Sequence, residues 1–152
     1  LPNTTIEFRQ DAYLDSGYIA NQEQKMEIYR RLAAIEDEKT LTDLIDEVID
    51  RFGTPSQPAE KLFRISEIRV KARHLGIGSI IDEGDSLLVT WADESFMHGW
   101  DPMKLPKTWL PYLKFLPGSP AKLRIHKALI KGTMTDWMAD FMDELKRETG
   151  KQ

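Results

Sequence analysis

Residues 40–55, TLTDLIDEVIDRFGTP, hold the most complete structural pattern in this chain. Thr40 followed by Asp43 is typical of the first turn of a helix. Gly53 suits the left-handed position after a last turn, and Pro55 blocks any continuation. The apolar side chains between these ends are Leu41, Leu44, Ile45, Val48, Ile49 and Phe52. At about 100° per residue they share one arc of roughly 140°, which predicts a helix over residues 40–52 with one face in a core.

The opposite face of this predicted helix is acidic, because it carries Asp43, Asp46, Glu47 and Asp50, with Arg51 at its flank. Packing does not require such a face, so a basic partner can be expected to dock there. A simpler interpretation is also open. Glu47 and Arg51 are spaced to pair along the helix, and Arg51 complements the negative helix end, each worth a few tenths of a kcal/mol.

The composition is typical of one globular domain. With 152 residues, 41% hydrophobic and 30% charged, the chain is long enough to bury a sizeable core. The net charge of −4 disfavours nucleic-acid binding by this chain alone. The sequence has no cysteine, which excludes disulfides and thiolate metal sites and fits a cytoplasmic address. We find no run of 18 apolar residues that would predict a membrane span.

The segments around the 40–52 helix show further strand and helix patterns. Alternating or β-branched apolar residues predict strands over residues 4–9, 77–81, 87–91 and 121–127. Residues 12–14 are expected to extend or pair with the first strand. Helical spacing predicts further helices over residues 21–35, 58–75 and 107–114, and after Thr133 or Thr135.

The order of these elements predicts an α+β fold, a compact single domain in which a mainly antiparallel sheet is packed with about five helices. The short connection at residues 36–39 predicts that the first two helices form a hairpin. Residues 58–75 are apolar on two flanks, which predicts a central helix that packs on both sides.

Motifs of catalysis are missing from the sequence. Neither the glycine-rich phosphate loops nor the G-x-S-x-G nucleophile turn occurs. His74, His98 and His126 are scattered singly, without the spacing of a metal pair. The acidic residues 82–85 fit a solvated hairpin turn better than a site for a hard cation. We therefore predict a chain that is not an enzyme, with no catalytic residue, no metal ligand and no cofactor of its own.

Three segments in order carry a family resemblance: YRRLA at residues 29–33, EVIDRFG at residues 47–53 and ARHLGI at residues 72–77. Together they resemble the C-terminal domain of bacterial transcription-repair coupling factor. The resemblance extends over roughly residues 2–95, from LPNTTIEFRQDAYLDSGYI onward, although the connection TPSQP at residues 54–58 is less proline-rich than is common in the family. By this resemblance, residues 1–152 are expected to form a C-terminal regulatory domain cut from a larger chain.

The resemblance implies an autoinhibitory function. The parent protein in this family is an ATP-dependent DNA translocase of the helicase superfamily, a hydrolase that uses ATP and magnesium in its motor domains. It engages RNA polymerase and DNA and recruits UvrA in transcription-coupled nucleotide excision repair. Its C-terminal domain docks on a UvrB-like N-terminal module of the same chain and masks the UvrA-binding surface. The family's docking residues carry over to Glu47, Asp50 and Arg51, whereas Phe52 and Gly53 look structural.

Two rival functions stay open from the sequence. The basic residues of the first and third predicted helices allow direct binding to nucleic acid or RNA polymerase, although they are interleaved with acids as on ordinary amphipathic helices. A small metal-dependent hydrolase is the other alternative.

Overall fold

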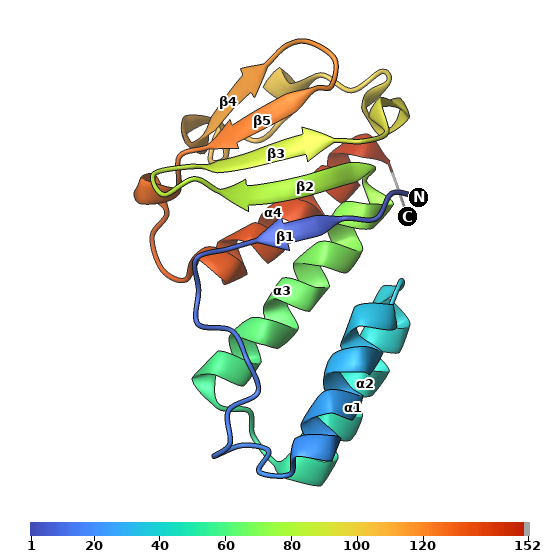
Figure 1. The fold of residues 1–152 in the computed structure, drawn as a ribbon. Helices are drawn as coiled ribbons and strands as arrows, with labels where there is room; N and C mark the ends of the chain where they lie inside the picture. The colour runs from blue at the N-terminus through green and yellow to red at the C-terminus, as the bar shows by residue number, and fades with distance from the viewer. Residues whose placement is uncertain (151–152) are drawn as a thin grey trace.

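The structure, a computed structural model, describes residues 1–150. Within this range a five-stranded sheet and four α-helices follow one another along the chain (Figure 1). The strands are β1 (Thr5–Glu7), β2 (Ile77–Asp82), β3 (Leu87–Trp91), β4 (Leu113–Leu116) and β5 (Lys122–Ile125). The helices are α1 (Gln22–Ala34), α2 (Glu38–Phe52), α3 (Gln57–His74) and α4 (Met134–Thr149).

The sheet has the order β1-β2-β3-β5-β4, in which only β1 and β2 run parallel. This confirms the predicted α+β class with a mainly antiparallel sheet. Residues 12–14 do not form or extend a strand, contrary to prediction. Their backbone is held by helices instead, because the Tyr13 N–H donates to the Pro58 carbonyl and the Leu14 N–H donates to the Tyr29 hydroxyl.

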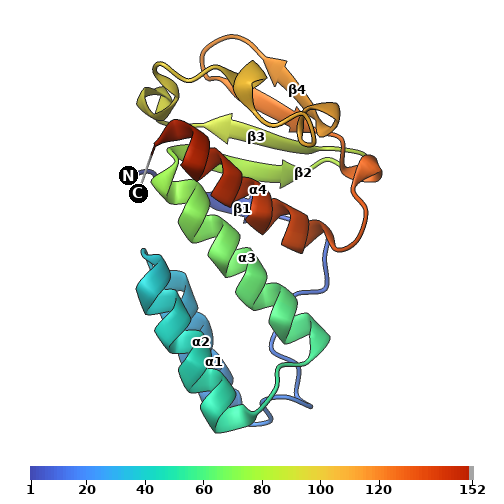
Figure 2. The same cartoon turned by 180° about the vertical axis from the view of Figure 1, so that it is seen from behind.

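Helix α3 separates two hydrophobic cores, as its two apolar flanks predict. Ile68 and Ala72 belong to the core between the sheet and α4, whereas Phe63 and Val70 belong to a second core with α1 and α2. Figures 1 and 2 show α4 beside α3 against the sheet and the predicted α1–α2 hairpin on the far side of α3. The hairpin shares its core with α3, and it also contacts the N-terminal segment through Tyr29 and α4 through Glu38.

The start of α2 differs from the prediction. The helix begins at Glu38, and its N-cap is Asp37 rather than Thr40, because the Asp37 carboxylate accepts hydrogen bonds from both the Thr40 N–H and its hydroxyl at 2.8 Å. At the other end Gly53 has the predicted positive φ, 85°, but its ψ of −167° places it outside the left-handed helical region.

The helix predicted over residues 107–114 is wrong, so the structure has four helices rather than about five. A short 3-10 turn, Leu110–Tyr112, leads there into β4, where Leu113 pairs with Ile125 of β5. Pro111 lacks the N–H that a longer helix would use. Pairing with β5 also satisfies the backbone of β4, which no local sequence pattern reveals.

The predicted solvated turn at residues 82–85 holds for Glu83 and Asp85, which are exposed, but Asp82 is buried at the end of β2. Its carboxylate accepts hydrogen bonds from the Lys127 ammonium at 2.8 and 3.0 Å and from the backbone N–H groups of Arg9 and Gly84. Burial alone would raise the pKa of Asp82, but these hydrogen bonds outweigh it and hold the pKa below 3.8. Asp82 thus joins three segments of the sheet lobe and is structural.

Candidate docking face on α2

Helix α2 is fixed in place by the apolar face that its sequence predicts. Leu41, Leu44 and Val48 are at most 3% exposed in the core beneath the hairpin, and Ile45 and Phe52 pack at its edge. Ile49 departs from the prediction, since its side chain is 40% exposed and lies outside the core. The C-terminal half of α2 therefore presents apolar as well as charged atoms to solvent.

Glu47 is bound across the hairpin by a residue from the neighbouring helix. Arg31 of α1 donates two parallel hydrogen bonds to its carboxylate, at 2.5 and 2.9 Å, and also lies 3.7 Å from Glu27. The hydrogen bond from Arg31 lowers the pKa of Glu47 below 4.5, and the same bond raises the pKa of Arg31. Glu47 consequently stays ionised and has a fixed orientation.

Arg51 has two neighbours on its own helix. One guanidinium nitrogen lies 3.4 Å from Glu47, which is the pair expected from the sequence spacing, and the guanidinium carbon lies 5.0 Å from the centroid of the Phe52 ring. These contacts are longer than those of Arg31, and 36% of the Arg51 side chain is exposed. Arg51 therefore keeps donors that can reach a partner.

Asp50 is the residue of the predicted set with no bonds at all. Its carboxylate is exposed and forms no hydrogen bond or ion pair within residues 1–150. Asp46, one turn earlier, is equally exposed and unpaired in the same range. The structure thus brings Glu47 and Arg51 together and leaves Asp50 open beside them.

Arg31 is the member of this cluster that sequence reasoning missed. Its spacing from Glu27 predicts only a pair within the first helix, which the structure contains as the longer contact. The predicted hairpin placed the two helices side by side, but it did not fix how far one is shifted along the other. A basic residue on the neighbouring helix, within reach of an acidic motif, was the available signal.

A shallow groove of about 370 Å³ lies between α2 and α3. Ile45, Ile49 and Phe63 contribute its apolar surface, and Glu60 and Glu67 also line it. None of Glu47, Asp50 and Arg51 lines this groove. The docking face is therefore the cluster of Glu47, Asp50 and Arg51, and a complementary partner would carry basic groups opposite its two carboxylates.

The basic residues of α1 and α3 are mostly engaged inside the molecule. Arg64 contacts Asp136 at 2.9 Å, Lys71 contacts Asp143 at 2.8 Å, and Arg69 donates to backbone carbonyls of the α1 end. Arg30, which is exposed, and the half-buried Lys61 are exceptions, without a partner in the described part of the chain. These pairs leave little free positive charge for a nucleic-acid interface.

Residues 1–150 contain no group of three or more His, Asp or Glu side chains placed to hold a metal ion. No helix in this range is sufficiently long and apolar to cross a membrane.

Comparison with known proteins places these features in a family. The family model described as the TRCF domain matches residues 8–99, which is more than half of the chain. The transcription-repair-coupling factor of Staphylococcus haemolyticus (strain JCSC1435) is 39% identical over 89 residues, or 59% of this chain and 8% of the relative. That of Staphylococcus aureus (strain USA300) is 40% identical over 84 residues, or 55% of this chain and 7% of the relative. The chain therefore spans less than a tenth of the length of these relatives.

The fold comparison extends beyond the matched sequence. A crystal structure of the C-terminal domain of transcription-repair coupling factor superposes with a TM-score of 0.81 at 18% identity, covering 99% of this chain and 97% of the other. The segment after residue 99, which the family model does not match, is thus part of the same fold. The chain belongs to the TRCF domain family and has the fold of the C-terminal domain of transcription-repair coupling factor.

Proposed function

We propose that this chain is the autoinhibitory C-terminal domain of an ATP-dependent DNA translocase that acts in transcription-coupled nucleotide excision repair. In this proposal it docks on the UvrB-like N-terminal module of the same parent chain and masks the surface that UvrA binds. Engagement of RNA polymerase and DNA by the parent releases it. ATP and magnesium belong to the motor domains of the parent, and this chain performs no catalysis.

The observation that carries this proposal is the open Asp50 carboxylate beside a fixed Glu47. An exposed carboxylate that pairs with nothing in its own domain contributes little to the fold. It is, however, ready to accept a bidentate hydrogen bond from a partner arginine without first breaking an internal bond. Family membership supports the same face, since the motif EVIDRFG runs through it.

The three residues have different tasks in this interface. Asp50 accepts from a basic partner group, and Arg51 donates to a partner carboxylate. Glu47 acts mainly as a positioning residue, because its oxygens already accept from Arg31 and Arg51 and hold the Arg51 side chain in place. Charged pairs of this kind gain strength when an interface removes water from them.

The first prediction concerns binding in trans. A pull-down of the UvrB-like N-terminal module by this chain should be competed by UvrA, because both occupy one surface. Asp50→Ala should weaken the binding at least about tenfold, since it leaves a desolvated partner charge without a counter-charge. Glu47→Ala should weaken it less than Asp50→Ala.

Matched control variants show whether binding depends on the Asp50 carboxylate itself or only on the total negative charge of the chain. Asp140→Ala removes an equally unpaired, exposed acid from α4 and should leave binding unchanged. Asp46→Ala removes one from the neighbouring turn and should have a small effect. Equal losses for all three aspartates would contradict a specific site. Tight DNA binding by this chain with a steep salt dependence would instead favour the nucleic-acid alternative.

A further inference from the structure

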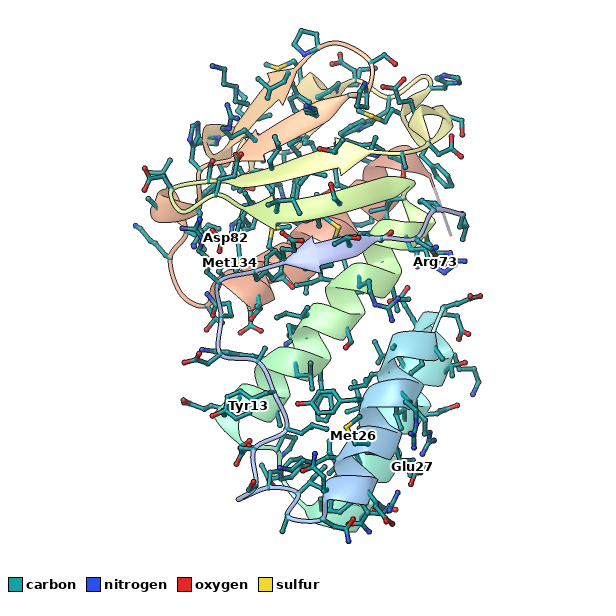
Figure 3. All side chains as sticks on the ribbon, viewed as in Figure 1. Tyr13, Met26, Glu27, Arg73, Asp82 and Met134 are labelled. Carbon is teal, nitrogen blue, oxygen red and sulfur yellow. The ribbon has the colours of Figure 1, made fainter. Side chains whose placement is uncertain are left out.

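A second polar cavity, of about 450 Å³, lies away from the docking face where the first turns of α3 and α4 meet. Two ion pairs show that the helices run side by side in the same direction. Arg64 pairs with Asp136, and seven residues further along each helix Lys71 pairs with Asp143. Their positive N-terminal ends therefore point the same way. Figure 3 labels Met134, the first residue of α4, at this end of the helix.

The first turn of α4 offers unused backbone donors. Its N-cap Thr133 makes no side-chain hydrogen bond to the helix, and the N–H groups of Met134, Thr135 and Asp136 donate to nothing within residues 1–150. The first N–H groups of a helix need a side chain, water or a ligand as acceptor. By contrast, the N-terminus of α3 is capped by Ser56, whose hydroxyl accepts from the Ala59 N–H.

An unpaired hydroxyl on an otherwise buried residue points to a ligand at the same place. Thr135 is only 1% exposed, it lines the cavity, and its side chain has no hydrogen-bond partner in the described part of the chain. Its hydroxyl is not among the fully buried unpaired atoms, so a ligand or water in the cavity can reach it. The hydroxyl of Thr133 is free in the same range and lies at the same mouth.

The charges around the cavity suit an anion. Lys61 of α3 lines it and forms no ion pair within residues 1–150. Two carboxylates also line it, but Asp136 is held by Arg64 at 2.9 Å, and Glu60 is exposed to solvent at the rim. Lys61, Thr133, Thr135 and the first turn of α4 with its three unpaired amides thus line one space.

We propose that this cavity binds a phosphate group, in the form of inorganic phosphate or a small phosphate monoester. A tetrahedral dianion has enough oxygens to accept from the amides of the first turn of α4, the Thr135 hydroxyl and Lys61 together. A phosphodiester has one charge fewer and two blocked oxygens, so it binds more weakly. This site is independent of the docking face and of the function proposed for it.

The test is thermal unfolding of the chain with and without inorganic phosphate, at an ionic strength kept constant with chloride. Phosphate should raise the Tm of the wild-type chain, because a ligand that binds only the folded state stabilises it. Thr135→Val should melt at the same or a higher temperature without phosphate, since it removes an unpaired hydroxyl from a buried residue. The same variant should lose the increase that phosphate causes. A variant that was merely misfolded would melt lower in both buffers.

Amide chemical shifts measured by NMR provide the affinity. Titration with phosphate should shift the amides of Thr135 and Asp136 saturably, and Thr135→Val and Lys61→Gln should each weaken binding by about tenfold. Thr42→Val and Lys107→Gln, at exposed positions without partners, are the matched controls and should bind as the wild type. No saturable shift, or equal affinity in all variants, overturns the proposal.

Two further probes separate the possible sources of the phosphate group. Glycerol 3-phosphate represents a small monoester, and dimethyl phosphate represents the diester of a nucleic-acid backbone. Tighter binding of glycerol 3-phosphate is the expected result. Equal or tighter binding of dimethyl phosphate overturns the assignment to a monoester.

Discussion

Glu47 links α1 to α2 through Arg31 before any partner is present. The hydrogen bond from Arg31 holds the pKa of Glu47 below 4.5, so the ionised form of Glu47 stabilises the folded state. A carboxylate with a lowered pKa contributes stability above its unfolded pKa, and this contribution is lost as the pH falls through the lower folded value. The hairpin contact is therefore weakened by acid.

Glu47→Gln tests this contribution. At neutral pH it should lower the Tm by about 1–3 °C, a small effect because both side chains are partly exposed. The difference from the wild type should shrink as the pH falls through the lowered pKa of folded Glu47, where the wild-type carboxylate also becomes neutral. Thermal melts at a series of pH values measure it. Glu23→Gln, at an exposed and unpaired residue of α1, should show no such trend, and a constant difference at every pH would contradict the argument.

The sequence predicted part of this site at the residue scale. Its motif resemblance indicated Glu47, Asp50 and Arg51, and helical spacing placed them on one exposed side of α2. It did not predict the bond between Arg31 and Glu47, because that bond depends on how two helices are shifted along each other. Helical spacing also assigned Ile49 to the core. The part of α2 that is in contact with the core is narrower than its apolar face, so Ile49 is left 40% exposed.

At the element scale, one arginine of α3 bonds to the backbone at the end of α1, in addition to the ion pairs that Lys71 forms with Glu38 and Arg73 with Glu36. Arg69 donates hydrogen bonds at 2.9 and 3.0 Å to the carbonyls of Leu32 and Ile35, at the C-terminal end of α1. The last carbonyls of a helix have no partner within the helix. Arg69 satisfies the Ile35 carbonyl and adds a second bond at the Leu32 carbonyl, which also accepts from the Ile35 N–H at 3.3 Å. Burial, with the nearby positive charge of Arg73, lowers the pKa of Arg69.

Arg69→Met removes these bonds and keeps an apolar stem of similar shape. It should lower the free energy of unfolding by about 2 kcal/mol, the typical value of charged hydrogen bonds to buried acceptors. Hydrogen exchange should then be faster in the last turn of α1 than in α4. Arg30→Met, at an exposed residue without a described partner, is the control and should change neither quantity by much. An equal acceleration in both helices would argue against a local tie.

β4 was harder to predict than the other elements for a physical reason. The apolar spacing of α1 to α4 is written in consecutive residues, and their bounds agree with prediction to within a few positions. β4 is a strand because β5 lies beside it, with Leu113 opposite Ile125, and this partner comes only after an intervening turn. The local spacing of apolar residues around Trp109 and Pro111 therefore indicated a helix, whereas pairing with β5 makes the following residues a strand.

At the scale of the whole molecule, α3 is shared by two hydrophobic cores, and only the core between the sheet and α4 contains tryptophan. Trp91 is buried in the core between sheet and α4, and Trp100, Trp109 and Trp137 pack against the same core. The core beneath the α1–α2 hairpin contains no tryptophan. Tryptophan fluorescence therefore follows the sheet lobe, whereas far-ultraviolet circular dichroism follows all four helices.

Because both lobes use α3, we expect them to unfold together. Phe63→Ala empties a site in the hairpin core, where Phe63 is 5% exposed, and should cost about 3–5 kcal/mol. The urea midpoint should fall by the same amount in fluorescence as in circular dichroism, although no tryptophan lies in the altered core. Met138→Ala, in the sheet core, should likewise shift both signals together. If Phe63→Ala moved only the circular dichroism transition, the hairpin would unfold on its own, and the docking face would sit on an independently unstable lobe.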